Sequence, residues 1–130
     1  MRGSVIISGA KNAVLPMMAA SLLADGVTTI SNVPDLRDTR TMASLIEITG
    51  AQVQLNYPEI SIDASTVHTL EAPYELVKTM RASFYVLGPI LGRFGKAKIS
   101  LPGGCAWGPR PVDFHLKALE KMGASIKLKE

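Results

Sequence analysis

The chain has 130 residues, 47% of them apolar, and carries a formal net charge of +3, which fits one domain with a core of its own. Charged residues interrupt every apolar run before the ~18 residues that a membrane span needs. The N-terminus MRGSVIISG lacks the basic segment, apolar core and cleavage site of a secretory signal, which favours the cytosol.

The first half of the chain predicts two helices and three strands. Residues 13–24 are apolar on every side and end at Asp25-Gly26, as in a buried helix, and residues 27–31 are rich in β-branched residues, as in a strand. A helix over 36–49 follows, with Asp35 as its expected N-cap and Asp38 in its first turn. Alternating segments at 51–56 and 59–64 around Asn56-Tyr57-Pro58 predict a β-hairpin.

The second half repeats this order. Residues 74–92 predict a helix that Gly88-Pro89 should kink or interrupt. A strand at 96–101, a helix at 111–122 and a strand at 124–129 follow. Because helix 13–24 is apolar all round, it needs neighbours on several sides, and the chain is expected to be a piece of a larger protein.

Two pairs of segments show an internal repeat. IEITGAQVQL at 46–55 matches LEKMGASIKL at 119–128, and GVTTIS at 26–31 matches GKAKIS at 95–100. The second copy therefore has four extra residues between its strand and its helix. We expect two like units, 1–63 and 74–130, that build an α/β architecture from repeated modules.

The extra residues lie in the loop 102–111 of PGGCAWGPRPVDFH, which holds the only cysteine, Cys105. Glycines let backbone N–H groups approach a ligand, and Arg110 lies beside the N-terminal end of the next helix, so the loop is typical of a phosphate or carboxylate site. In the first copy, Asp35 and Asp38 are expected to fill this role themselves. Asp113 could likewise cap the second helix and close the site.

Charge and thiol chemistry agree with an anion site. Residues 1–92 carry six basic and eight acidic side chains (net −2), and residues 93–130 carry eight and three (net +5). An electropositive loop lowers the pKa of a thiol, which would make Cys105 a proton donor or nucleophile near neutral pH. The alternatives are a solvated basic face and a small buried cysteine.

Three further positions are candidates. Asn12 could cap helix 13–24 while Lys11 offers a charge at its positive end, although a solvated lysine is the simpler interpretation. Arg81 lies among apolar residues and needs an anionic partner, which can be structural or a ligand. His115 could bind a ligand or a backbone carbonyl. No cluster of residues has metal-ligand spacing.

The segments SGAKNAVLPMMAA, NVPDLRDTRTM, KTMRASFYVLGPILGRFG and LPGGCAWGPRPVDFHLKALEKMGA together resemble the enolpyruvyl transferase family of peptidoglycan synthesis. The resemblance covers essentially the whole chain. It implies an inside-out α/β barrel of the EPSP synthase type, assembled from βαβαββ-like units, with about two of the three units of one domain present. The second domain would lie outside this sequence.

The resemblance also implies an activity and roles for individual residues. The family transfers the enolpyruvyl group of phosphoenolpyruvate to the 3-hydroxyl of UDP-N-acetylglucosamine and releases phosphate. Cys105 would donate the proton and could form a covalent adduct. The phosphoenolpyruvate contacts would be Lys11, Asn12 and Arg110, and the nucleotide-sugar contacts would be Arg81, Arg110, Pro111, Val112, Asp113 and Phe114.

The resemblance implies no cofactor, no membrane and no nucleic-acid partner. Two other functions stay open at this point. The chain could be a non-catalytic fragment that binds an anion or nucleotide sugar, because the acidic base of the reaction would lie in absent sequence. A basic nucleic-acid-binding module is poorly supported, since aromatic residues are 5% of the chain and no Lys or Arg runs occur.

Overall fold

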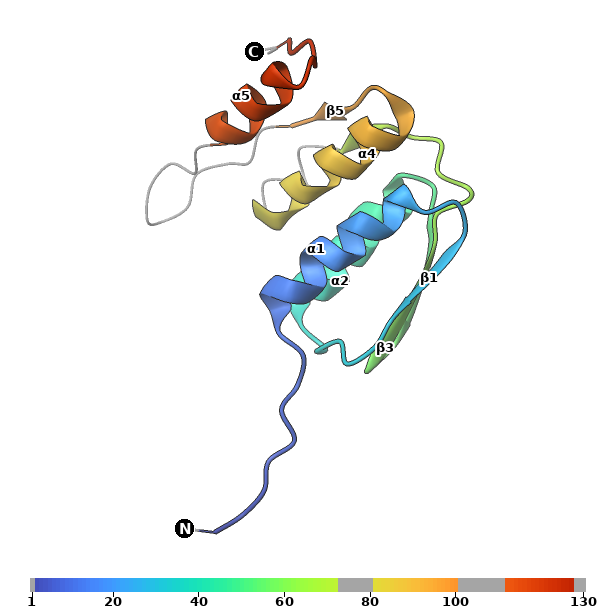
Figure 1. The fold of residues 1–130 in the computed structure, drawn as a ribbon. Helices are drawn as coiled ribbons and strands as arrows, with labels where there is room; N and C mark the ends of the chain where they lie inside the picture. The colour runs from blue at the N-terminus through green and yellow to red at the C-terminus, as the bar shows by residue number, and fades with distance from the viewer. Residues whose placement is uncertain (1, 73–80, 101–111, 128–130) are drawn as a thin grey trace.

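The computed structural model describes residues 2–72, 81–100 and 112–127 (Figure 1). Its elements are α1 (Lys11–Ala20), the 3-10 helix η1 (Ser21–Leu23), β1 (Val27–Ile30), α2 (Arg37–Ile48), β2 (Gln52–Asn56), β3 (Glu59–Asp63), β4 (Glu71–Ala72), the 3-10 helix η2 (Arg81–Val86), α4 (Leu87–Phe94), β5 (Lys98–Ile99) and α5 (Asp113–Lys121). This mixture confirms the predicted α/β class. Within the described ranges, no helix is long and apolar enough to cross a membrane.

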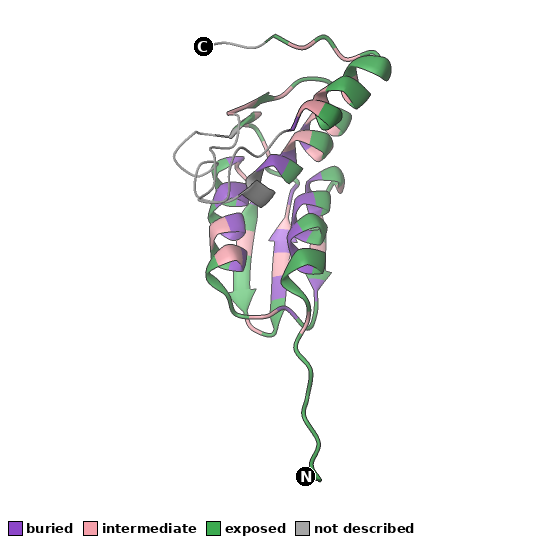
Figure 2. Ribbon diagram, turned by 90° about the vertical axis from the view of Figure 1, so that its left-hand side faces the viewer, coloured by how far each residue is buried: buried purple, intermediate pink, exposed green. Residues whose placement is uncertain are grey.

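Three strands form an antiparallel sheet in the order β1-β3-β2. The predicted hairpin is confirmed, because β2 and β3 pair from Gln52↔Asp63 to Asn56↔Glu59. In β3 the fully buried Ile60 and Ile62 alternate with more exposed neighbours, the pattern of a strand with one face on a core. Helices α1 and α2 cover that face (Figures 1 and 2).

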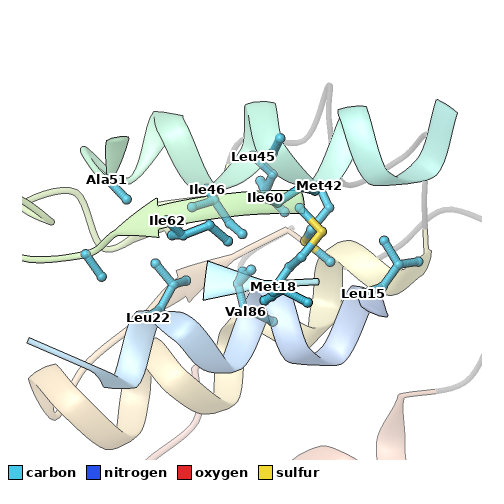
Figure 3. Close-up of a cluster of buried hydrophobic side chains, with 14 of the residues drawn as sticks. Leu15, Met18, Leu22, Met42, Leu45, Ile46, Ala51, Ile60, Ile62 and Val86 are labelled. Atoms are coloured by element: carbon cyan, nitrogen blue, oxygen red, sulfur yellow. The ribbon is translucent and has the colours of Figure 1, made fainter. Parts of the chain in front are cut away.

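The core lies between this sheet and the two helices (Figure 3). Its largest fully buried apolar side chains come from α1, η1, α2, β3, η2 and α4: Met18, Leu22, Met42, Leu45, Ile46, Ile60, Ile62, Val86 and Ile90. Burial of one such side chain is worth about 1.5–3 kcal/mol. Because η2 and α4 contribute to it, the two halves of the chain share one core.

Helix α1 and η1 confirm the predicted helix, but α1 is buried on one side only. It packs against α2, β1 and η2, while η1, which continues it, packs against α4. Val14, Leu15, Met18 and Ala19 are buried. Met17 and Leu23 nevertheless remain 54% and 55% exposed, so the described chain leaves part of this apolar surface uncovered.

The helices of the two halves run in the same direction. Since η2 precedes α4 and packs on α1, while α4 packs on η1, the pair η2–α4 is parallel to α1–η1. Figure 1 shows α5 running the same way along the outside. The N-terminal ends of the helices therefore lie at one end of the fold.

Arg93 of α4 joins the second half of the chain to the first. Its Nη1 donates to the carbonyl oxygens of Leu22, Ala24 and Ala64 at 3.1, 2.7 and 2.9 Å, so one of its two hydrogens is shared. Its Nη2 lies 2.9 Å from Asp25 Oδ1, and the side chain is only 18% exposed. The guanidinium thus satisfies free carbonyls where η1 ends.

The two copies of the repeat end their second helix in the same way. Gly50 follows α2 with φ of 98°, and Gly123 follows α5 with φ of 101°, the left-handed conformation that favours glycine after a helix. Gly50 N donates to Glu47 O, and Gly123 N donates to Glu120 O, both at 2.9 Å. Residues 73 positions apart in the two copies therefore make the same hydrogen bonds.

Three predictions about local structure need correction. Helix α2 has Leu36 rather than Asp35 as its N-cap. Of the predicted strand 124–129, residues 124–127 have no strand, and strand 96–101 shrinks to Lys98–Ile99. This β5 pairs in parallel with β4, which the sequence did not predict. The predicted interruption of the helix near Gly88-Pro89 is found just before Gly88, where η2 ends at Val86 and α4 begins at Leu87.

Gly50 should tolerate alanine worse than Gly123. A Cβ at Gly50 would lie 2.6 Å from His68 Cδ2 and 2.9 Å from Thr66 O, whereas a Cβ at Gly123 meets nothing within 4 Å. Both variants carry the strain of a positive φ, about 1 kcal/mol. We expect Gly123→Ala to lower the free energy of unfolding by about that amount and Gly50→Ala by roughly 2–4 kcal/mol in urea titrations. Equal losses would contradict this assignment.

Substitutions can distinguish the stability that Arg93 gains from its hydrogen bonds to carbonyl oxygens from the stability that it gains from its ion pair with Asp25. Arg93→Met keeps the apolar stem but leaves three carbonyls without their donor, and we expect a loss of roughly 2–4 kcal/mol. Asp25→Asn removes only an exposed ion pair, and the expected loss is below about 1 kcal/mol. Urea unfolding of both variants measures the difference. An Asp25→Asn loss as large as that of Arg93→Met would show that the ion pair carries the stability.

Candidate functional site

The N-terminal ends of α1, α2 and α5 point to the same end of the fold (Figure 1), and Lys11, Asn12, Asp113 and Phe114 lie in the first turns of α1 and α5. Each helix presents unpaired backbone N–H groups and a partial positive charge there. No side-chain hydrogen bond caps α1 or α5. This end of the molecule can therefore bind anions.

Lys11 is the first residue of α1 and contacts the neighbouring helix. Its Nζ lies 2.8 Å from Oδ2 of Asp38, in the first turn of α2. The lysine side chain is 45% exposed and the aspartate side chain 35%. Lys11 is thus neither simply solvated nor sequestered, because it is paired on one side and open on the other.

The turn before α2 differs from its prediction. Asp35 accepts from Arg40 Nε and Nη2 at 2.8 and 2.7 Å. This bidentate hydrogen bond holds the pKa of Asp35 below its usual value and raises the pKa of Arg40. The hydroxyl of Thr39 instead accepts from Leu36 N at 3.2 Å. The two carboxylates of the first copy are therefore used by cations and do not cap the helix.

Asn12 does not cap α1 as predicted. The N-cap is Ala10, whose carbonyl accepts from Ala13 N and Val14 N at 3.0 Å, and Asn12 is an exposed residue of the first turn. Gly9 sets the path into this helix, since a Cβ there would collide with the carbonyl oxygen of Asn32. Lys11 and Asn12 are therefore exposed residues of the first turn of α1.

Helix α5 begins with three of the predicted nucleotide-sugar contacts. Val112 is its N-cap and is buried. Asp113 lies 3.5 Å from Lys117 Nζ and makes no capping bond, so the alternative in which it closes the helix end is not what the structure shows. Phe114 is 76% exposed, with Lys117 Nζ 5.7 Å from its ring centre.

His115 packs against the aromatic ring of Phe84 rather than pointing to the helix end. The two rings meet edge to face with centroids 5.9 Å apart. His115 also lines a mainly apolar cavity of about 440 Å³ between α1, η2, α4 and α5, together with Pro16, Ala19, Phe84, Pro89 and Leu119. This environment gives His115 a packing role.

The remaining predicted site residues lie at the limit of the described chain. Cys105, Arg110 and Pro111 fall outside the described residues. Arg81 begins η2, and its side chain lies outside the described part. In the residues that the structure does describe, no group of three or more His, Cys, Asp or Glu is placed to hold a metal ion.

Sequence reasoning missed the pairing of Asp38 with Lys11. Residues 27 positions apart carry no helical or strand periodicity that could link them. The one signal was that Lys11 and Asp38 each fall in the first turn of a predicted helix, and two parallel neighbouring helices bring their first turns together.

Comparison with known proteins identifies what the chain resembles. The family model described as EPSP synthase (3-phosphoshikimate 1-carboxyvinyltransferase) matches residues 1–130. A protein of Chloroherpeton thalassium named UDP-N-acetylglucosamine 1-carboxyvinyltransferase is 56% identical over 131 residues, covering 100% of this chain and 30% of that protein. One of the same name from Trichlorobacter lovleyi is 55% identical over 128 residues, covering 98% of this chain and 30% of its own.

A solved structure has a similar fold. The enolpyruvyl transferase NikO from Streptomyces tendae superposes with a TM-score of 0.83 at 25% identity, over 99% of this chain and 28% of that one. The chain therefore has part of an EPSP synthase-like fold, as its motifs implied. It spans about 30% of the length of the curated relatives that it matches.

Gly9→Ala should disturb the entry to α1, whereas Gly3→Ala should not. The added Cβ at Gly9 meets the Asn32 carbonyl, while at Gly3 nothing lies within 4 Å. Relief of this overlap should cost roughly 1–3 kcal/mol of stability or displace residues 2–10. Thermal unfolding, with backbone amide shifts of Asn32 and Lys11, would detect either result. Identical spectra for the two variants would show that Gly9 does not fix this path.

Proposed function

The chain belongs to the EPSP synthase family, and from this premise we propose that it is the N-terminal part of an enzyme that transfers the enolpyruvyl group of phosphoenolpyruvate to UDP-N-acetylglucosamine. The acceptor is the 3-hydroxyl of the sugar, and phosphate is released. This reaction serves peptidoglycan synthesis. The identity of 56% along the whole chain to a protein named for this activity is the observation that carries the proposal.

The helix ends support the binding of both substrates. Phosphoenolpyruvate has a carboxylate and a phosphate, and the nucleotide sugar has a diphosphate, so the site must hold several negative charges. The N-terminal ends of α1 and α5 have no side-chain cap, and Lys11 adds an ammonium group at the end of α1. Together they supply positive potential at one end of the fold. We assign Lys11, Asn12 and Arg110 to phosphoenolpyruvate.

The nucleotide sugar is assigned to the start of α5 and to Arg81. Within the segment from Arg110 to Phe114, the residues Pro111, Val112 and Asp113 lead into the helix, whose N-terminal end can face the diphosphate. The exposed ring of Phe114 offers an apolar surface on which a planar base or a sugar can pack. Arg81 can add a charged contact from η2.

Cys105 is assigned as the proton donor. Its S–H proton passes to the methylene carbon of phosphoenolpyruvate, and the C2 centre becomes oxocarbenium-like. The sugar hydroxyl then attacks C2 and loses its proton to a base outside this chain. Departure of phosphate, with transfer of one methyl proton back to the Cys105 thiolate, restores the double bond. Attack of the thiolate on C2 instead of the hydroxyl gives a covalent adduct of Cys105.

Residues 1–63 and 74–130 form two repeat units, with 102–111 as the catalytic loop, and a further domain of the same protein completes the site. The reaction needs no cofactor, nucleic acid or membrane, and the enzyme acts in the cytoplasm.

A chimaera tests the function. The chain replaces the matching 30% of the Chloroherpeton thalassium relative, and phosphate release is measured with both substrates. We expect turnover that requires UDP-N-acetylglucosamine and that falls about 10²–10⁴-fold in Cys105→Ala. The chimaera with Ser65→Ala, in the exposed loop after β3, is the control and should keep its activity.

The second candidate function is that of a fragment that binds the nucleotide sugar without catalysis. The observation that favours it is that the chain covers only 30% of the Chloroherpeton thalassium relative. It predicts that the chimaera binds the nucleotide sugar but releases no phosphate. Full activity of Cys105→Ala would remove the proposed proton donor while leaving the family assignment intact.

A further inference from the structure

The ion pair between Lys11 and Asp38 places a cation where a helix does not favour one. Lys11 is the first residue of α1, and the positive end of a helix dipole repels a nearby ammonium group. Asp38 Oδ2 at 2.8 Å from Nζ offsets this repulsion. The carboxylate therefore stabilises the lysine at a position that the helix alone would disfavour.

Asp38 is not needed to cap its own helix. The Thr39 hydroxyl accepts from Leu36 N at 3.2 Å and also lies 3.0 Å from Tyr57 Oη. Asp35, the other carboxylate of this turn, is engaged by Arg40. The contact that the structure gives the Asp38 carboxylate is thus directed across to α1.

The pair also leaves Lys11 able to bind. An ammonium group has three donors, and a contact with one carboxylate oxygen accounts for one of them. With its side chain 45% exposed, Lys11 can direct other donors to an anion at the end of α1. The carboxylate at the same time removes freedom from a long, flexible side chain.

We propose that Asp38 is a positioning residue that holds the ammonium group of Lys11 in place for phosphoenolpyruvate. The inference rests on the proposed function of Lys11 and assigns the residue that acts through it. Asp38 itself does not touch the substrate. A carboxylate close to an anion site would by itself weaken anion binding, so positioning and simple charge repulsion predict opposite effects of removing it.

A double-mutant cycle tests this in the chimaera described above, in a Cys105→Ala background so that binding is read without turnover. The cycle comprises the parent, Asp38→Asn, Lys11→Met and the double variant, and calorimetry gives the dissociation constant for phosphoenolpyruvate. Asp38→Asn should raise this constant about two- to fivefold. Lys11→Met should raise it about tenfold or more, and Asp38→Asn should add nothing in that background.

Two controls separate positioning from loss of structure. Asp35→Asn removes the neighbouring carboxylate that contacts Arg40 rather than Lys11, and it should leave the dissociation constant unchanged. The constant for UDP-N-acetylglucosamine should also stay the same in Asp38→Asn. Because both members of the pair are partly exposed, Asp38→Asn should unfold within a few degrees of the parent.

Several outcomes would overturn the inference. The first is a dissociation constant for phosphoenolpyruvate that is unchanged or lowered in Asp38→Asn. The second is that Asp38→Asn raises this constant equally in the Lys11 and Lys11→Met backgrounds. The third is that Asp35→Asn raises it as much as Asp38→Asn does. A parent that binds no phosphoenolpyruvate, or binding indifferent to Lys11→Met, would overturn it together with the role of Lys11. Binding coupled to both residues in a chimaera without transferase turnover would instead support the inference and contradict the proposed function.

Discussion

The fold depends on how Arg93 holds the C-terminal end of the first helical segment. Its guanidinium bonds to the carbonyl oxygens of Leu22 and Ala24, where η1 ends, and to that of Ala64 after β3. A cation at the C-terminal end of a helix is also favoured by the dipole. Since Arg93 lies in the last turn of α4, this contact aligns the C-terminal ends of the two segments. It thereby makes them parallel and sends their N-terminal ends to the opposite side of the molecule.

That opposite side has the reverse electrostatics. Several helix N-termini point to that side, no side chain caps α1 or α5, and the residue placed first in α1 is a lysine. Such an arrangement costs stability unless an anion is present. In the free protein Asp38 supplies part of that charge. The C-terminal ends of the helices are thus stabilised by Arg93, whereas the N-terminal ends keep unsatisfied positive potential. Local rules for stability are commonly broken in this way at binding sites.

Much of this fold follows from local sequence, and the parts that do not are contacts across the chain. The hairpin of β2 and β3 and the helix over 13–24 were predicted because strand alternation and an apolar run act over a few residues. Arg93 was not predicted to matter, since before the fold is known it is one basic residue among eight in its region. The cap of α2 was wrong for a similar reason. Asp35 is of a residue type that favours an N-cap, but it lies one residue before the observed cap and Arg40 engages it with two hydrogen bonds.

The pairing of Asp38 with Lys11 also changes the interpretation of the internal repeat. If Asp35 and Asp38 had closed the first turn, that copy would be a purely structural version of the second. In the structure, Asp38 reaches from that turn to Lys11 at the start of α1. The first copy therefore places a carboxylate beside the cation at the start of α1, whereas α5 of the second copy begins without a side-chain cap. The two copies thus differ in how the first turn of their second helix is used.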